Sequence, residues 1–198
     1  LPIDTFIGNL FLILSIILFL IFFIFEQNKK KMFFFLVITS IITFLLLVLS
    51  NINRPDAGLY HIPYVSLINE NKIIFGIANI HFRFAHISIL QYLSAANLNF
   101  LFSISNITVP VASLVAVYIY HIIDKCFEFL NKEMVIESFI VFLIVIYSLY
   151  SFNRYSNFGN DASAHIYLFI IFVYFLEITK LNSLNNIFFY KVSFLIIF

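Results

Sequence analysis

The run Phe6-Ile-Gly-Asn-Leu-Phe-Leu-Ile-Leu-Ser-Ile-Ile-Leu-Phe-Leu-Ile-Phe-Phe-Ile-Phe25, followed by Glu26-Gln-Asn-Lys-Lys-Lys31, decides the fold. A helix needs about 20 apolar residues to cross ~30 Å of hydrocarbon, and this run has that length. Backbone amides inside lipid must hydrogen-bond within their own segment, so the run is expected to be a helix. A charged cluster ends it, and a second apolar run begins at Phe33. The sequence therefore predicts an all-α protein that spans a membrane.

The composition agrees with this prediction and excludes other classes of protein. Hydrophobic residues make up 63% of the chain, charged residues only 11%, and the mean hydropathy is +1.04. A soluble globular domain has roughly half apolar and a quarter charged residues, so that class is excluded. The apolar runs lack the alternation of a β-barrel. The net charge of +1 comes with lysines in short loops, which offer no basic face to a nucleic acid.

Six spans are expected, packed as a polytopic helix bundle in one transmembrane domain over residues 1–198. Their approximate limits are 6–25, 33–49, 109–123, 135–150, 162–176 and a last run from about 187. The chain starts at Leu1 without a methionine and stops at Phe198 inside this last run. We therefore expect a fragment of a longer protein, truncated at both ends.

The lysines and arginines predict the orientation of this bundle. Three consecutive lysines, Lys29 to Lys31, lie in the short loop after the first span, and such loops stay cytoplasmic. Seven basic residues then fall on the cytoplasmic side and four on the outer side. We expect a multi-pass protein of the inner (cytoplasmic) membrane whose loop at residues 51–105 is extracytoplasmic.

This loop is a polar segment within an apolar sequence. Residues 54–86 hold two of the four prolines, two of the four glycines and three of the five histidines. The stretches 59–69 and 86–99 have apolar residues at helical spacing but are less hydrophobic than a span. We expect short helices that lie at the membrane interface, although the second could partly enter the membrane. Because chemistry needs polar groups at a fixed depth, the loop is the predicted site.

Asp56 is the leading candidate for a catalytic residue in this loop. It lies between Pro55 and Gly58, in a turn directly after the second span. A carboxylate there can act as a general base on an acceptor hydroxyl, or it can bind a divalent cation. The alternative role is the N-cap of the 59–69 helix, which Asp commonly provides.

Five further polar side chains of the loop are candidates for catalysis or substrate binding: Tyr60, His61, Asn79, His81 and Arg83. Tyr60 follows the candidate carboxylate by four residues and could share its helix face, although interfacial tyrosines are common. His61 could orient a substrate or tune the carboxylate. The last three alternate with apolar residues, so an extended segment would turn them to one side. The Arg83 guanidinium suits phosphate or pyrophosphate, and a lipid headgroup would satisfy it equally well.

Asp161 and His165 form a second candidate pair for substrate binding, one helical turn apart at the outer start of a span. A charge inside a membrane segment costs about 2.5–3.5 kcal/mol on insertion scales, so such residues face protein or a water-filled cavity. Asp161 can instead cap its helix and favour the positive end of the helix dipole. His165 could face the same cavity as Asp56.

The polar loop resembles a family of uncharacterised bacterial polytopic membrane proteins. The residues that carry the resemblance are Asp56-Ala-Gly58-Leu-Tyr60-His61, Ile68-Asn-Glu70 and Gly76-Ile-Ala-Asn79-Ile-His81-Phe-Arg83. They match the family pattern D-x-G-x-Y-H … I-x-E … G-x-x-N-x-H-x-R over positions 56–90. The family often has Pro in place of Phe75 and Asn in place of His86. It looks like a distant relative of the GT-C glycosyltransferases, which use lipid-linked sugar donors.

The resemblance implies roles for these positions. Asp56 would be the catalytic or metal-organising carboxylate, and Arg83 would bind the donor phosphate. His61 and His81 would support them, and the remaining matched polar positions, Tyr60, Glu70 and Asn79, would contact the substrate. Asp161 fits a second acidic position at the start of a later span. The best-known GT-C enzymes have one span before the catalytic loop, whereas at least two precede it here.

The resemblance therefore predicts a GT-C-like enzyme of cell-envelope glycan synthesis. It would transfer a sugar from a polyprenyl-phosphate donor to an extracytoplasmic acceptor, with membrane lipid and the lipid-linked sugar as partners. Two alternatives stay open, namely a polysaccharide polymerase or ligase and a transporter or flippase component without chemistry. Transporters need polar or broken segments near the bilayer midplane, whereas the polar residues here gather at one edge.

Overall fold

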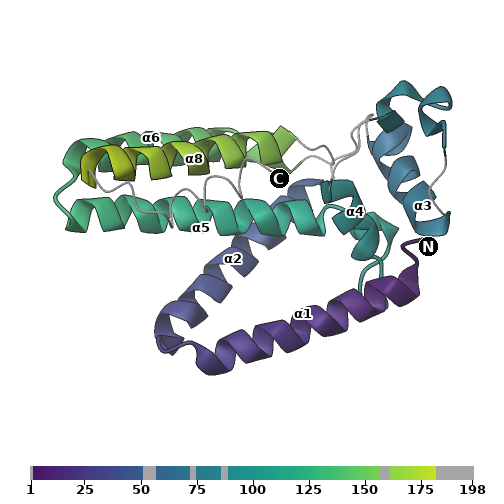
Figure 1. Ribbon diagram of the computed structural model, residues 1–198, viewed down its shortest axis with the longest axis horizontal. Helices are drawn as coiled ribbons and strands as arrows, with labels where there is room; N and C mark the ends of the chain where they lie inside the picture. Colours follow the sequence, from purple (N-terminus) through teal and green to yellow (C-terminus); the bar gives the residue numbers. More distant parts are fainter. Residues whose placement is uncertain (1, 51–56, 72–74, 86–88, 157–160, 182–198) are drawn as a thin grey trace.

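Figure 1 shows a computed structural model of the protein, which describes residues 2–50, 57–71, 75–85, 89–156 and 161–181. Within these ranges every regular element is a helix, as the sequence predicted. In chain order the elements are α1 (Thr5–Phe25), α2 (Lys29–Ser50), η1 (Ala57–His61), α3 (Ile62–Glu70), η2 (Ile77–Asn79), η3 (Phe82–Ala85), α4 (Ile89–Ala96), η4 (Ile104–Asn106), α5 (Val109–Asn131), α6 (Val135–Tyr150), α7 (Phe152–Tyr155) and α8 (Asp161–Leu181).

Five helices coincide with expected spans, which indicates a membrane protein. Among the described residues, four segments are long and apolar enough to cross a membrane, namely Thr5–Phe25, Lys29–Ser50, Ile104–Asn131 and Ala162–Thr179. Helix α6 has 16 residues. At 1.5 Å per residue it reaches about 24 Å, which is less than the ~30 Å of hydrocarbon. The sixth expected span, from about residue 187, lies outside the described residues.

Helix α5 is the centre of a bundle with α2, α6 and α8 (Figure 1). It contributes the largest share of the main core, which includes Val115, Tyr118, Ile122 and Phe129 of α5, Leu46 of α2, Val141 of α6, and Ile166 and Val173 of α8. Between membrane helices lipid supplies no hydrophobic driving force, so close packing and interhelical hydrogen bonds hold such a bundle together.

Two polar contacts define the two ends of this bundle. The hydroxyls of Ser50 and Thr108 lie 3.2 Å apart, where α2 ends and α5 begins. At the opposite end, Lys31 Nζ lies 3.0 Å from Asp124 Oδ2. Helices α2 and α5 are therefore antiparallel. We refer to the Ser50 side as the loop end and to the Lys31 side as the charged end.

The expected loop over residues 124–133 is wrong for most of its length. Helix α5 continues to Asn131, and only a tight turn, in which Glu133 has φ 60°, connects it to α6. The helix persists through these residues because their charges are paired and need no loop. Asp124 pairs with Lys31 of α2, and Lys125 pairs with Glu177 of α8. Glu128 pairs with Lys125, one turn earlier in α5 itself.

Helix α1 stands apart from the bundle along most of its length (Figure 1). Asp4 caps its start by accepting a hydrogen bond from the Ile7 amide at 3.0 Å. Gly8 is its buried residue, and a Cβ there would overlap the carbonyl oxygen of Leu98. The Asn9 side chain accepts a hydrogen bond from the Phe100 amide at 3.0 Å. The beginning of α1 is thus fastened to the segment after α4, and the rest presents an apolar surface.

Helices α3 and α4 form a small separate unit at the loop end. They share a second core of Val65, Ala95, Leu98 and Ile107. Pro63 lies in the first turn of α3, where its missing N–H costs no helical hydrogen bond. The prediction of two short helices in the loop is confirmed within the described residues, with α3 close to the limits expected and α4 ending at Ala96.

Candidate functional site

Three of the predicted polar residues meet beside α3. Cζ of Arg83 lies 4.4 Å from the centroid of the Tyr60 ring, a cation–π contact. The Tyr60 and His81 rings are stacked, with centroids 6.1 Å apart and an interplanar angle of 13°. Arg83 is exposed, while Tyr60 and His81 are half-buried. This Arg83 cluster, made of Tyr60, His81 and Arg83, is the best-formed part of the predicted site.

Two short 3-10 turns position the cluster, so the extended conformation that would turn Asn79, His81 and Arg83 to one side is not present. Gly76 has φ 77° in the left-handed region, and its carbonyl accepts a hydrogen bond from the Asn79 amide at 2.8 Å. A second turn follows, in which the Phe84 amide donates to the His81 carbonyl at 2.9 Å. In these turns residues two apart do not lie on one side by strand alternation. The cluster forms because the chain folds back onto Tyr60.

The His81 ring is further fixed by its own backbone neighbour. The Arg83 amide donates a hydrogen bond to His81 Nδ1 at 3.3 Å. A neutral imidazole that accepts at Nδ1 carries its proton on Nε2. His81 can therefore offer an N–H from the ring edge that lies away from the backbone.

Of the two predicted catalytic residues, the structure describes His61 but not Asp56. His61 is buried, and its ring centroid lies 4.1 Å from that of Tyr60. It supports the tyrosine from inside and does not share the exposed surface of Arg83. Asp56 lies outside the described residues, so its role as the catalytic carboxylate stays a prediction.

The other predicted positions are less closely grouped. Asn79 is exposed, and its side-chain nitrogen lies beside Gly76. Glu70 is exposed at the far end of α3 from His61. Asp161 begins α8 as expected, but its side chain lies outside the described part of the structure. A substrate-binding role for these residues stays a prediction.

His165 lies in a different group of aromatic residues. Its Nδ1 is 3.4 Å from the Tyr155 hydroxyl, and its ring contacts those of Tyr147, Tyr155 and Phe169. These partners belong to α6, α7 and α8, whereas the Arg83 cluster rests on η1 and η3. The described contacts of His165 therefore do not bring it to Arg83.

The described residues hold no group of three or more His, Cys, Asp or Glu side chains that could bind a metal ion. Within the Arg83 cluster, His81 is the residue whose side chain commonly binds metal ions. A divalent cation at this site would need Asp56, which lies outside the described ranges.

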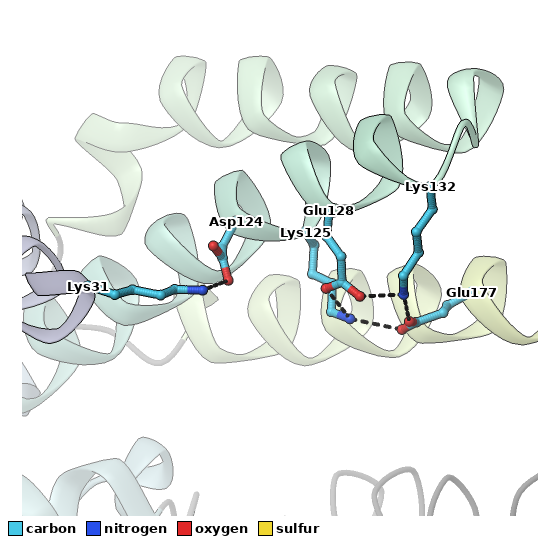
Figure 2. Close-up of polar contacts among 6 residues, drawn as sticks. All are labelled: Lys31, Asp124, Lys125, Glu128, Lys132 and Glu177. Carbon is cyan, nitrogen blue, oxygen red and sulfur yellow. Dashed lines mark hydrogen bonds and ion pairs between the residues drawn. The ribbon is translucent and has the colours of Figure 1, made fainter. Parts of the chain in front are cut away.

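A second polar constellation, at the charged end, was missed by sequence reasoning. Lys125 Nζ lies 2.9 Å from Glu128 Oε2 and 2.9 Å from Glu177 Oε2, and Lys132 Nζ lies 2.5 Å from Glu128 Oε1 and 3.2 Å from Glu177 Oε1. Figure 2 shows that each ammonium group lies between the two carboxylates. The hydrogen bond to Glu128 raises the pKa of Lys132 above its ordinary value. We call these four residues the charged ring.

The spacing of the charges along the sequence could have predicted the pairs of Glu128 with Lys125 and with Lys132, but not the part of Glu177. Glu128 lies three residues after Lys125 and four before Lys132, both of which are neighbouring positions on a helix. Because the span expected from the sequence ends at about residue 123, the prediction places these charges in a loop and not on one helix face. Glu177 comes from α8, and nothing local in the sequence places it there.

Comparison with known proteins adds a family. A family model described as Domain of unknown function (DUF8201) matches residues 48–198. The chain belongs to this family. No curated protein and no solved structure gives a significant match. The DUF8201 match begins in the last turn of α2 and contains both the Arg83 cluster and the charged ring.

Proposed function

We propose that this protein is a GT-C-like glycosyltransferase of the cytoplasmic membrane, which transfers a sugar from a polyprenyl-phosphate donor to an acceptor outside the cytoplasm. Such a reaction would serve cell-envelope glycan synthesis. The supporting observation is the Arg83 cluster, in which an exposed guanidinium is held on the Tyr60 ring beside His81. This arrangement suits the phosphate of a lipid-linked donor.

The proposed reaction places the largest change in charge at this phosphate. The acceptor hydroxyl oxygen attacks the anomeric carbon of the sugar, and the bond from that carbon to the donor phosphate oxygen breaks. The phosphate keeps the electron pair and gains negative charge. Arg83 offers planar N–H donors that can pair with two phosphate oxygens, and the His81 Nε2–H can supply another.

The proton of the acceptor hydroxyl requires a base. In this proposal Asp56 takes it, because a carboxylate near the end of α2 would lie within the same short segment as Tyr60. The same carboxylate could instead hold a divalent cation that binds the donor phosphate. Both roles place the chemistry at the loop end of the bundle.

The distribution of basic residues supports an outward-facing loop end. Lys31, Lys125 and Lys132 gather at the charged end, opposite the Arg83 cluster along α2 and α5. Positively charged residues in short loops and close to the ends of spans stay in the cytoplasm. The charged end would then face the cytoplasm, and the Arg83 cluster would face the outer surface where lipid-linked sugars are used.

The test replaces the two key residues in the full-length protein in cells and measures surface glycan together with membrane abundance. Removal of one donor to a developing anion typically costs about 100-fold or more in rate, so Arg83→Ala and Asp56→Asn should nearly abolish the glycan. Arg83→Lys should give an intermediate loss, because it keeps the charge but not the fork. Arg154→Ala removes a guanidinium from α7 and is the matched control. Normal glycan in both Arg83→Ala and Asp56→Asn at normal abundance would refute the proposal.

A further inference from the structure

Large apolar side chains are exposed in the two segments that form the Arg83 cluster. Phe75 is 95% exposed and Phe82 is 70% exposed, and Leu59 and Ile80 are exposed as well. Together with Arg83 these four residues form what we call the Arg83 patch. Single exposed apolar residues are ordinary, but several within two short segments that meet at one cation mark a surface that contacts a partner or a membrane.

The packing of Phe84 determines which side of this segment is outside. The Phe84 ring is buried and lies against Tyr64 of α3, with centroids 5.2 Å apart. His81 packs between Phe82 and Phe84, at 5.0 and 5.3 Å. With one phenylalanine fixed against α3, its neighbours Phe82 and Arg83 are left on the outer side. The exposure of Phe82 and Arg83 thus follows from the packing of Phe84 against Tyr64.

The unit that carries the patch is attached to the spanning helices at the loop end. The Ile3 amide, just before α1, donates a hydrogen bond to the Ile68 carbonyl of α3 at 3.2 Å. The Asn69 side chain of α3 donates to the Ile3 carbonyl. The far end of α2 reaches the same side, since α1 and α2 are consecutive spanning helices joined by a short turn. Helix α3 is therefore held at the level where the spans leave the hydrocarbon.

The chemistry of the patch matches one partner better than others. Phenylalanine and isoleucine side chains favour the acyl region, and a guanidinium favours the phosphate just above it. Arg83 lies beside one of these rings, with Cζ 5.7 Å from the Phe82 centroid. A free phosphate ion would need the cation alone and would leave the apolar side chains in water. A phospholipid contacts both parts at once.

We propose that the Arg83 patch is a lipid-binding surface that enters the membrane leaflet at the loop end. Its phenylalanine and isoleucine side chains lie among the upper acyl chains, and Arg83 binds the phosphate of an anionic phospholipid. A ligand would then reach Arg83 from within the bilayer and not from water. The lipid-binding surface shares Arg83 with the proposed function but does not require that a sugar be transferred.

The absence of tryptophan from the sequence makes the depth of the patch measurable. Single tryptophans are introduced as Phe75→Trp and Phe82→Trp in the full chain, which is reconstituted in vesicles of phosphatidylcholine brominated along the acyl chain. Because a surface segment enters only about 5–10 Å, bromines near the upper acyl chain should quench both tryptophans about twofold. Bromines near the ends of the acyl chains, at the bilayer centre, are the matched control and should quench both tryptophans much less.

A second arm tests the phosphate contact. Brominated phosphatidylglycerol is added as a minor component of unbrominated phosphatidylcholine vesicles, and quenching of the Phe82→Trp protein is followed. If Arg83 recruits the anionic lipid, brominated phosphatidylglycerol should quench the tryptophan more strongly than brominated phosphatidylcholine present at the same fraction. The excess should vanish in Phe82→Trp with Arg83→Ala, while the depth-dependent quenching remains. Inorganic phosphate in the buffer should not abolish the excess.

Each result has a defined meaning. Absence of quenching of the Phe82→Trp protein by bromines near the upper acyl chain would overturn the proposal that the patch enters the leaflet. An excess that survives Arg83→Ala, or that inorganic phosphate removes, would overturn the assignment of Arg83 to lipid phosphate. If the lipid results hold while Arg83→Ala and Asp56→Asn both leave surface glycan unchanged, the lipid surface is supported and the glycosyltransferase proposal fails.

Discussion

The Lys125 ammonium lies 2.9 Å from a carboxylate oxygen of Glu177, joining the central helix α5 to α8 at the charged end of the bundle. Both side chains are largely buried, at 13% and 18% exposure. Each of the two carboxylates in the charged ring contacts both ammonium groups (Figure 2). Removal of one carboxylate leaves two cations close to a single anion.

Glu177→Ala should therefore destabilise the bundle. Breaking a buried ion pair costs about 3–5 kcal/mol, and here the partly exposed Lys132 lowers the expected cost to about 1–3 kcal/mol. The measurement is thermal unfolding of the purified protein in detergent. Lys31→Ala is the control, because its pair with Asp124 is exposed at 57% and 43% and should contribute about 0–1 kcal/mol. Equal losses for the two variants would contradict the importance of the ring.

The charged ring should also respond to alkaline pH through Lys132. Its pKa is raised above the ordinary 10.5 by its hydrogen bond to Glu128. A group whose pKa is raised on folding contributes stability that is fully present below the unfolded value and is lost as pH rises through the folded value. The unfolding temperature of the wild type relative to Lys132→Gln should stay constant from pH 7 to about pH 9 and fall only above about pH 10.5. A decline already near neutral pH would show that another group is responsible.

The spanning helices could be predicted because each forms a continuous apolar run that is long enough for a membrane. The end of α5 could not, since its charged residues have the composition of a loop until the partners of Asp124 on α2 and of Lys125 on α8 are known. The attachment of α1 has no sequence signal either. Gly8 reads as an ordinary residue of an apolar run, and its close approach to Leu98 depends on a turn ninety residues away.

The contact at Gly8 makes a specific prediction. Gly8→Ala should push α1 away from the segment after α4, because the new Cβ would overlap the Leu98 carbonyl oxygen, which is backbone and cannot rotate aside. Overpacking of this kind costs about 1–3 kcal/mol. Thermal unfolding measures the loss, and weaker crosslinking between cysteines placed at Asn9 and Phe100 would confirm its location.

Gly58→Ala is the matched control for that substitution. A Cβ at Gly58 would meet no heavy atom of the described residues within 4 Å, so the change should be neutral or stabilising by up to about 1 kcal/mol. If both glycine variants lose stability equally, the close approach of α1 is not the cause.

The hydrogen bond between Tyr118 and Ser148 tests the packing of α5 on α6. The two hydroxyl oxygens lie 2.8 Å apart in the buried core, and the Ser148 hydroxyl also contacts the Ile144 carbonyl at 2.8 Å. Tyr118→Phe should cost about 0.6 kcal/mol and at most about 1.7 kcal/mol, the range for hydrogen bonds between membrane helices. Because the serine keeps its own carbonyl partner, no unsatisfied donor is left behind. A loss well above this range in thermal unfolding would mean that the tyrosine hydroxyl supports more than one helix contact.

The candidate site shows a different limit of sequence reasoning. Alternation grouped Asn79, His81 and Arg83, whereas the structure brings His81 and Arg83 together on Tyr60 without Asn79, and for a reason other than strand geometry. The left-handed Gly76 begins a pair of 3-10 turns, and the fold-back onto Tyr60 brings the residues together. Spacing can suggest which residues share a site, whereas the path of the chain between them depends on contacts such as that of Phe84 with Tyr64.

The Tyr60 ring gives the sharpest test of the Arg83 cluster. Tyr60→Phe keeps an aromatic face under the guanidinium and should leave the apparent affinity for a lipid-linked donor within about twofold of the wild type, since its cation–π contact persists. Tyr60→Ala removes that face, and an exposed contact of this kind is worth about 0.5–1 kcal/mol, or a loss of roughly two- to fivefold. Arg83→Ala should be more severe than either, because it removes the charge itself. If the phenylalanine variant is as impaired as the alanine variant, the hydroxyl and not the ring is the functional group, and Tyr60 would act on the substrate directly instead of positioning Arg83.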